Sequence, residues 1–221
     1  MYVNGADIDI HNVCQYLLDM APLPKSPRRS RDEMIAETTA KLIQAARRAF
    51  ASRGYADTAL ADLCAEAGLT RGAVYHHFGG KEGLLEAVLN LINGDISRRL
   101  EHGMQSAADP WTGFRECCLS YLDLALDPEI QRIVMRDAPA VLGQRFRDID
   151  EANSLGPMTQ SIRELLDLGL IQPADPEALA RLVNGSVLDA AMWVAAANDP
   201  QERLPKARQA LSTLLDGIAR H

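Results

Sequence analysis

Residues 65–85 read AEAGLTRGAVYHHFGGKEGLL, and this stretch decides how the rest of the chain is interpreted. A helical pattern stops at Gly68, resumes briefly from Thr70 and stops again at Gly79-Gly80. Glycine suits the first stop because it adopts positive φ without a steric penalty. A helix, a tight turn that contains glycine and a second short helix make up the helix-turn-helix pattern. The stretch therefore predicts a motif whose second helix places its N-terminal residues in the major groove of DNA.

The predicted second helix, residues 70–78, carries little apolar surface of its own. Only Val74 and Phe78 are spaced to anchor it inward, so its other side chains are left for a partner. Thr70 at the helix N-terminus suits a phosphate group, and Arg71 suits bidentate recognition of guanine. Together with the start of the following helix, the residues that we expect to contact DNA are Thr70, Arg71, Gly72, Tyr75, His76, His77 and Lys81.

The adjacent histidines His76 and His77 raise the alternative of a metal site. Neighbouring residues diverge on a helix, so the two rings cannot hold one ion from a single face. Neither histidine has another His, Cys, Asp or Glu three or four residues away. We therefore expect no metal and no cofactor. The chain also lacks a P-loop, a GxGxxG motif and a recognisable pairing of a nucleophile with a base, so we do not expect an enzyme.

Charge is distributed unevenly along the 221 residues, whose formal net charge is −7. Residues 25–100 carry 12 Lys or Arg against 9 Asp or Glu, whereas residues 101–221 carry 11 against 18. This asymmetry predicts that the first part serves an anionic partner and the second part does not.

The cysteines and the apolar segments indicate a cytoplasmic protein without a membrane span. The acidic first 20 residues do not resemble a signal peptide. The least polar long stretch, residues 182–198, is interrupted by Asp189, which favours a buried helix. The cysteines form no CxxC pair and no zinc-ligand spacing, which favours a reducing compartment: Cys14, Cys64, Cys117 and Cys118.

Helical periodicity extends from Asp32 to the end of the chain, and no stretch alternates as a strand would, so the predicted fold class is all-α. Asp57 or Thr58 is expected to cap the second of these helices. A further short helix is expected over residues 8–20, followed by a basic arm over residues 21–30. The expected helices are 32–53, 60–67, 70–78, 81–101, 110–125, 128–136, 138–168 with a break near 153–157, 175–197 and 200–219.

Residues 39–89 resemble the DNA-binding domain of the TetR (tetracycline-repressor) family of transcriptional regulators. The matching features, at fixed spacing, are a first helix that ends AF..RGY, the motif AGLT.G..Y.HF at residues 67–78 and KEGLL at residues 81–85. The resemblance implies a cytoplasmic, all-helical homodimer that represses transcription from a palindromic operator in double-stranded DNA until a small ligand releases it. It also adds Thr58 to the DNA-contacting positions, although Ala59 stands where a second hydroxyl often lies.

The resemblance further implies how the chain is divided. A rival interpretation, a helical ligand-binding protein that has lost its DNA function, is disfavoured because Thr70, Tyr75, His77 and Lys81 are all present. The implied parts are an N-terminal extension and basic arm (1–31), a three-helix helix-turn-helix DNA-binding domain (32–80) and a helical ligand-binding and dimerisation domain (81–221) whose first helix (81–101) links the two.

Aromatic, apolar and sulfur-containing residues of the second half are candidates for a ligand pocket, and they indicate a small, largely apolar ligand. Ordinary core packing is the alternative for each of them. Cys117 and Cys118 raise the further hypothesis of a thiol sensor, which would need a lowered thiol pKa. The candidate ligand-binding residues are Trp111, Phe114, Cys118, Tyr121, Met135, Met158 and Trp193.

Small residues are frequent over residues 178–197, where they would permit a close approach of helices. The TetR resemblance implies that the last two helices form the dimer interface. The alternative, a tightly packed core within one chain, would need the same residues.

Overall fold

The structure is a computed structural model that describes residues 31–220, with side chains from residue 35 onward. The predicted helix over residues 8–20 and the basic arm over residues 21–30 lie outside the described residues. Contacts divide the chain into two units, Met1–Glu37 and Thr38–His221, and all the contacts that follow lie within the second.

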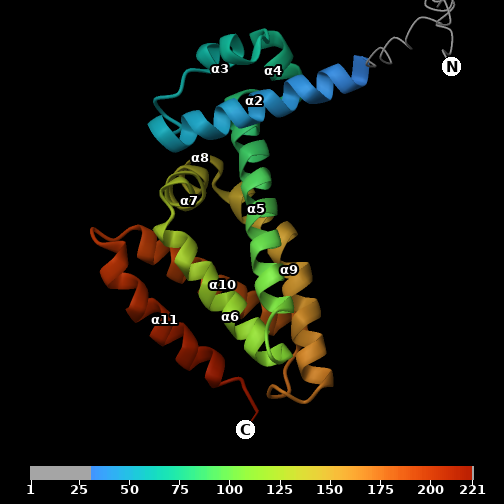
Figure 1. Cartoon of the computed structure of the whole chain (residues 1–221), viewed down its shortest axis with the longest axis vertical. Coiled ribbons are helices and arrows are strands. Elements are labelled where there is room, and N and C mark those ends of the chain that lie inside the picture. Colours follow the sequence, from blue (N-terminus) through green and yellow to red (C-terminus); the bar gives the residue numbers. More distant parts are fainter. Residues whose placement is uncertain (1–30, 221) are drawn as a thin grey trace, which may run out of the picture. The chain divides into compact units, whose positions relative to one another are not determined.

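The described chain consists of helices and short connections (Figure 1), so the predicted all-α class is confirmed. An isolated bridge between Ile171 and Ala219 is the one β-type pairing among residues 31–220. Within the same residues, no helix combines the length and the apolarity that crossing a membrane requires. The helices are α2 (Arg31–Arg53), α3 (Leu60–Ala67), α4 (Arg71–Phe78), α5 (Lys81–Gln105), α6 (Pro110–Asp123), α7 (Pro128–Arg132), α8 (Ala138–Leu142), α9 (Gln144–Asp167), α10 (Pro176–Ala195) and α11 (Pro200–Asp216).

Helices α6, α7, α10 and α11 all begin with the dipeptide Asp-Pro. In each, the aspartate carboxylate accepts hydrogen bonds from backbone N–H groups of the first turn, and the proline takes the first helical position. Asp175, for example, accepts from the backbone N–H of Ala178 at 2.8 Å. Each cap contributes about 1 kcal/mol to stability. Local signals therefore fix most helix starts in the second half of the chain.

The start of α3 differs from the prediction that Asp57 or Thr58 caps it. The N-cap residue is Ala59, which offers no side-chain acceptor. Thr58 is buried, and its hydroxyl donates to the backbone oxygen of Gly54 at 2.8 Å. The prediction was wrong because this hydroxyl satisfies a carbonyl just after α2 and is not available at the start of α3.

The interruption within residues 138–168 also lies elsewhere than predicted. Helix α9 runs unbroken through Pro157, whereas the chain turns at Gly143, whose φ is +56°. Glycine adopts this conformation without the strain that a side chain would add. Between α7 and α8, residues Ile133–Asp137 form a π-helical turn.

Helix α5 is the long helix that follows α4 (Figure 1), and its buried residues belong to the same hydrophobic core as those of α2 and α6. It packs on α4 and on α6, α8 and α9. Leu84 and Leu85 near its start, and Ile92 further along, are fully or almost fully buried. A Cβ atom on Gly83 would lie 1.7 Å from the carbonyl oxygen of Phe78. The backbone of α5 therefore contacts the end of α4 directly, and α5 fixes how α4 is oriented.

The C-terminal end of α2 is held by the last residue of α7 and by the π-helical turn that follows it. Asp137 accepts a hydrogen bond from the backbone N–H of Tyr55 at 2.7 Å. Arg132 donates to the carbonyl oxygen of Arg53 at 2.8 Å. We call these two contacts the α2 clamp. They join the end of α2, the helix that precedes the helix-turn-helix motif, to the second half of the chain.

An ion-pair network on Arg47 supports the same junction. The Arg47 guanidinium donates to both carboxylate oxygens of Glu129, at 2.8 and 2.7 Å, and to Asp95 at 2.6 Å. Hydrogen bonds to Glu129 and Asp95 raise the pKa of Arg47 above its already high ordinary value, with burial opposing them. Arg47 therefore links α2 to both α5 and α7 as a permanent cation.

Candidate nucleic-acid interface and internal cavity

The turn between α3 and α4 has the geometry that the sequence predicts. Gly68 ends α3 with a φ of +67°, and the backbone N–H of Leu69 returns to the carbonyl of Cys64 at 2.8 Å. Thr70 is the N-cap of α4, and its hydroxyl oxygen accepts a hydrogen bond from the backbone N–H of Ala73 at 3.2 Å. Val74 is fully buried and holds α4 against the core.

The rest of α4 faces outward. Tyr75 is 60% exposed, which is unusual for so large an aromatic side chain. Its ring lies near Gly80, since a Cβ there would approach Tyr75 Cε1 to 3.2 Å. At Gly72 a Cβ would meet no atom closer than 3.9 Å, so the fold leaves open space there. The structure brings together as exposed residues Thr70, Arg71, Gly72, Tyr75, His76 and His77.

Arg71 has no ion-pair partner within residues 31–220, unlike Arg47 and Arg48 of α2. Arg47 is paired as described above, and Arg48 pairs with Glu66 at 2.8 Å. An exposed guanidinium at a helix N-terminus, without an internal partner, is available to bind an external anion or a base edge.

Two of the predicted DNA-contacting residues are engaged internally. The ammonium of Lys81 lies 4.2 Å above the ring of Tyr55 and donates to the carbonyl of Ala56 at 3.4 Å. Burial lowers its pKa, with nearby carboxylates opposing the shift. Thr58 is buried, and Gly54 already accepts from its hydroxyl. The side chain of Thr58 is therefore not free to bind a phosphate, whereas Lys81 would have to extend to reach one.

A cavity of about 150 Å³ lies among α5, α6, α9 and α10, and its lining is mostly apolar. Four of the predicted ligand-binding residues line it, namely Phe114, Cys118, Tyr121 and Met158. Sequence reasoning missed the contribution of α5 and two polar residues, Asp150 of α9 and Asn184 of α10. The side chains that sequence reasoning did not name as ligand-binding are Asn93, Ile96, Ser97, Leu100, Glu101 and Met104 of α5, Asp150, Asn153, Ser154, Pro157 and Ser161 of α9, and Asn184, Val187 and Leu188 of α10.

The other three predicted residues lie outside this cavity. Trp111 is half-buried and stacks on Phe114 with ring centroids 6.2 Å apart. Met135 is buried in the π-helical turn. Trp193 is 49% exposed and lies beneath the Arg203 guanidinium at 4.8 Å. The expectation that these three side chains wall the same pocket is therefore corrected by how the helices pack.

Asp150 and Asn184 form the polar end of the cavity. The Asn184 side-chain amide donates to Asp150 Oδ2 at 2.8 Å, and the Ser154 hydroxyl approaches Oδ1 at 3.5 Å. Burial raises the pKa of the Asp150 carboxyl, although these hydrogen bonds oppose the shift. The pKa of Tyr121 is also raised, first by burial and then by the charge of Asp150. The signal for this pair in the sequence was Asn184, a polar residue beside the inward-facing Val183.

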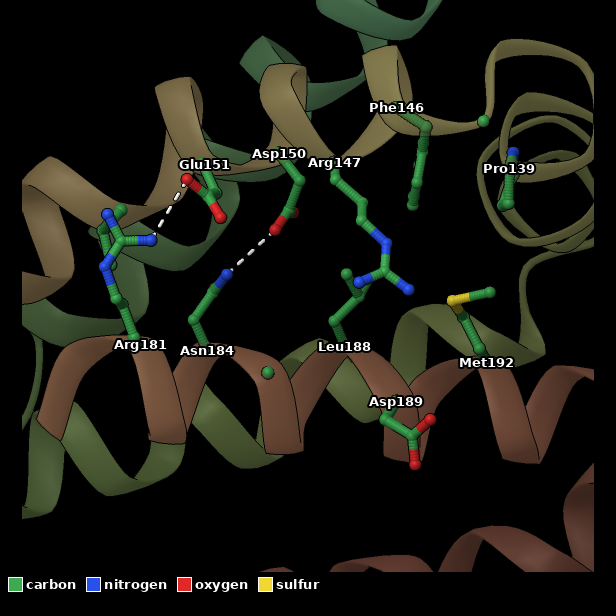
Figure 2. Close-up of a pocket in the computed structure, with 13 residues that line it drawn as sticks. Pro139, Phe146, Arg147, Asp150, Glu151, Arg181, Asn184, Leu188, Asp189 and Met192 are labelled. Carbon is green, nitrogen blue, oxygen red and sulfur yellow. Dashed lines mark hydrogen bonds and ion pairs between the residues drawn. The ribbon is translucent and has the colours of Figure 1, made fainter. Parts of the chain in front are cut away.

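A second, wider cavity of about 570 Å³ lies on the other side of this pair, between α9 and α10 (Figure 2). Figure 2 shows Asp150 and Asn184 pointing toward each other from the two helices, with the Glu151–Arg181 ion pair beside them at 3.2 Å. The lining of the wider cavity carries both signs of charge, including Arg147 and Asp189.

Cys117 and Cys118 are poorly suited to act as thiol sensors. Burial raises the pKa of Cys117 to about 11 and that of Cys118 to about 12. Because the thiolate is the reactive form, both side chains remain protonated and weakly nucleophilic at neutral pH.

Helices α10 and α11 expose large apolar side chains, namely Leu182 (69%), Trp193 (49%) and Leu214 (45%). Gly185 lies on the same stripe of α10 as Leu182, and a Cβ there would meet nothing within 4 Å. Other small residues of α10, such as Ala180 and Ala191, are buried in the core of the chain. The small residues therefore divide between an internal core and an exposed face.

Two known families match the chain, and together they cover at least part of every described helix. Residues 42–88 match the family described as bacterial regulatory proteins, tetR family, and residues 111–218 match the tetracyclin repressor-like C-terminal domain. A crystal structure of a TetR-family transcriptional regulator from Pectobacterium atrosepticum is similar over 87% of this chain and 99% of that chain, with a TM-score of 0.79 and 47% identity.

More distant relatives give the same result. The HTH-type transcriptional regulator TtgR of Pseudomonas putida is 39% identical over 110 residues, which are 48% of this chain and 51% of TtgR. AcrR of Shigella flexneri is 31% identical over 100 residues, 45% of this chain and 46% of AcrR. The chain thus spans about half the length of these curated relatives. RolR, in complex with resorcinol, shares the fold at a TM-score of 0.67 and 19% identity, over 83% of this chain and 90% of RolR.

Proposed function

Because the chain belongs to the TetR family of DNA-binding transcriptional regulators, we propose that it is a cytoplasmic repressor that a small, largely apolar ligand releases from its operator. A regulator of this family is not an enzyme. The observation that carries the proposal is α4, which Val74 holds against the core while Tyr75 remains exposed and Arg71 has no salt bridge within residues 31–220.

The DNA contacts follow from the exposed groups of α4. The N-terminal amides of α4 and Thr70 bind a phosphate, and Arg71 binds guanine through two hydrogen bonds. Tyr75, His76 and His77 reach the flanking backbone, and Gly72 lets the helix approach the bases closely. Lys81 adds a phosphate contact once it leaves Tyr55, whereas Thr58 contributes by shaping the end of α2. In this proposal residues 32–80 form the DNA-binding domain.

A homodimer with two-fold symmetry supplies the second copy of α4. Leu182, Trp193 and Leu214 are exposed on α10 and α11, and Gly185 lets another helix approach closely. Burial of these apolar side chains against the same face of a second copy stabilises the dimer. Two recognition helices about 34 Å apart meet successive major grooves on one side of the duplex, so the operator is a palindrome.

The ligand acts through α5, which forms one wall of the cavity and also carries α4 at its start. A ligand releases DNA only if it binds more tightly to the conformation whose recognition helices are misplaced. A coupling free energy of about 1–3 kcal/mol would lower operator affinity by about 5- to 150-fold. Residues 81–221 are the ligand-binding and dimerisation domain in this proposal.

A gel-shift titration with the promoter region of the protein's own gene tests the proposal. If a dimer neutralises about six to eight phosphates, the logarithm of the association constant falls with the logarithm of salt concentration at a slope of about −5 to −7. Arg71→Ala should abolish the preference for the promoter over scrambled DNA, while Arg163→Ala, an exposed arginine of α9, should not. A flat salt response, or ligand binding without any DNA binding, would contradict the proposal.

A further inference from the structure

The cavity of about 150 Å³ is lined by acidic side chains and by no basic ones among the described residues. Two carboxylic acids line it, Glu101 of α5 and Asp150 of α9, and no lysine or arginine of the described chain does. Asp150 also lines the wider cavity, whose basic residues are Arg147 and Arg181. Arg181 is engaged by Glu151 and Glu177, at 3.2 and 3.3 Å. A carboxylate desolvated in an apolar site attracts cations and repels anions more strongly than it does in water.

Asp150 lacks a counter-ion. It forms no salt bridge within residues 31–220, and its direct hydrogen bonds come from the neutral side chains of Asn184 and Ser154. These two donors leave lone pairs on both carboxylate oxygens, because an ionised carboxylate accepts about four hydrogen bonds. Burial raises the pKa of this carboxyl, a cost that a bound cation would offset.

The remainder of the lining suits one aromatic ring. A cavity of about 150 Å³ lined by apolar groups accommodates a molecule as large as benzene. Phe114 and Tyr121 offer aromatic faces and Met158 a flexible apolar wall. Aromatic faces also attract cations, so the apolar and the charged parts of the cavity favour the same kind of molecule.

We propose that the ligand of this cavity is a small protonated aromatic amine, whose ring packs among Phe114, Tyr121 and Met158 and whose ammonium group donates hydrogen bonds to Asp150. The inference rests on the proposed function, because it names the chemical class of the effector that binds there. Asn184 holds the carboxylate in place and so acts as a positioning residue.

The test is calorimetric titration of the full chain with three probes of nearly equal size: 2-phenylethylamine, 2-phenylethanol and phenylacetate. The wild-type protein should bind the amine about tenfold or more tightly than the alcohol, because a hydrogen bond to a charged group is worth more than a neutral one. Phenylacetate should bind most weakly. Equal affinity for the amine and the alcohol, or preference for the carboxylate, would overturn the inference.

The matched variant is Asp150→Asn, which keeps the shape and can still bond with Asn184. This variant should bind the amine and the alcohol with about equal affinity. Its affinity for the alcohol should stay within about twofold of that of the wild type. Glu101→Gln should reduce the preference in part and serves if Asp150→Asn does not fold. The control is Asp148→Asn, the same change of charge at an exposed position of α9, which should leave the preference unchanged. A preference for the amine that survives in Asp150→Asn would refute the role of this carboxylate.

The same protein samples separate this inference from the proposed function. If none of the probes binds while the gel shift with promoter DNA is intact, both the amine and the cavity assignment are wrong and DNA binding stands. If the amine binds as expected but no DNA is bound, the proposed regulator is wrong and the specificity of the cavity stands.

Discussion

Replacing Arg47 with methionine removes the cation that joins α2 to α5 and α7 while keeping an apolar stem of similar length. The change leaves Glu129 without a counter-ion, whereas Asp95 keeps its ion pair with Arg98. Removing one partner of a fully buried ion pair costs about 3–5 kcal/mol, and an exposed pair contributes about 0–1 kcal/mol. The side chains of Arg47 and Glu129 are 21% and 28% exposed. We therefore expect a loss of about 2 kcal/mol in the free energy of unfolding.

The loss can be measured by urea unfolding and by thermal melts. For a chain of this length, about 2 kcal/mol lowers the melting temperature by about 4–8 °C. The matched control is Arg48→Met, since the side chains of the Arg48–Glu66 pair are 65% and 52% exposed, and it should cost less than about 1 kcal/mol. Adding Glu129→Gln to Arg47→Met should recover part of the loss, because the unpaired charge is then gone. An Arg47→Met variant no less stable than Arg48→Met, or a double variant without recovery, would refute this reasoning.

Three further predictions concern the interfaces and the cavity. Arg71→Ala should weaken operator binding by about 1–3 kcal/mol per half-site and relax base preference, whereas Lys81→Ala should weaken all sequences alike; gel shifts on operator and scrambled DNA compare them. Leu182→Asp should give folded monomers in light scattering, and a variant that remains dimeric would exclude this face as the interface. Burial raises the pKa of Asp150, so the native state loses stability as pH rises through that raised pKa. Asp150→Asn should therefore have the same melting temperature as the wild type near pH 4 and a higher one near pH 8. Thermal unfolding of both proteins between these pH values tests this.

The features that the sequence predicted correctly depend on neighbours along the chain. Gly68 and the Thr70 cap act within one turn of their own positions, and so do the aspartates that begin α6 and α10. The all-α class follows from the same kind of local periodicity. Such signals do not depend on how the helices later pack, so they can be recognised in the sequence alone.

The features that the sequence did not reveal depend on contacts between distant residues. Whether Trp193 faces a cavity or the surface is set by the packing of α10 among its neighbours, and Trp193 is exposed. The hydrogen bond between Asp150 and Asn184 joins positions 34 residues apart. The capping role of Thr58 was misassigned for a related reason: a hydroxyl that precedes a helix can donate to a carbonyl behind it, here that of Gly54, and not accept at the start of the helix. Helical periodicity alone does not decide between such partners.

The α2 clamp has a mechanical consequence. The helix-turn-helix is attached to the rest of the chain covalently where it enters α5 and non-covalently along α2, where Arg132 and Asp137 hold the end of the helix and Arg47 pairs with Glu129 and Asp95. A body held at two points turns freely only about the line that joins them. With the clamp closed, we therefore expect a displacement of α5 to turn α4 about the line that joins these attachments. If the two hydrogen bonds of the clamp were broken, the same displacement of α5 would move α4 in several directions, and it would no longer determine the orientation of α4.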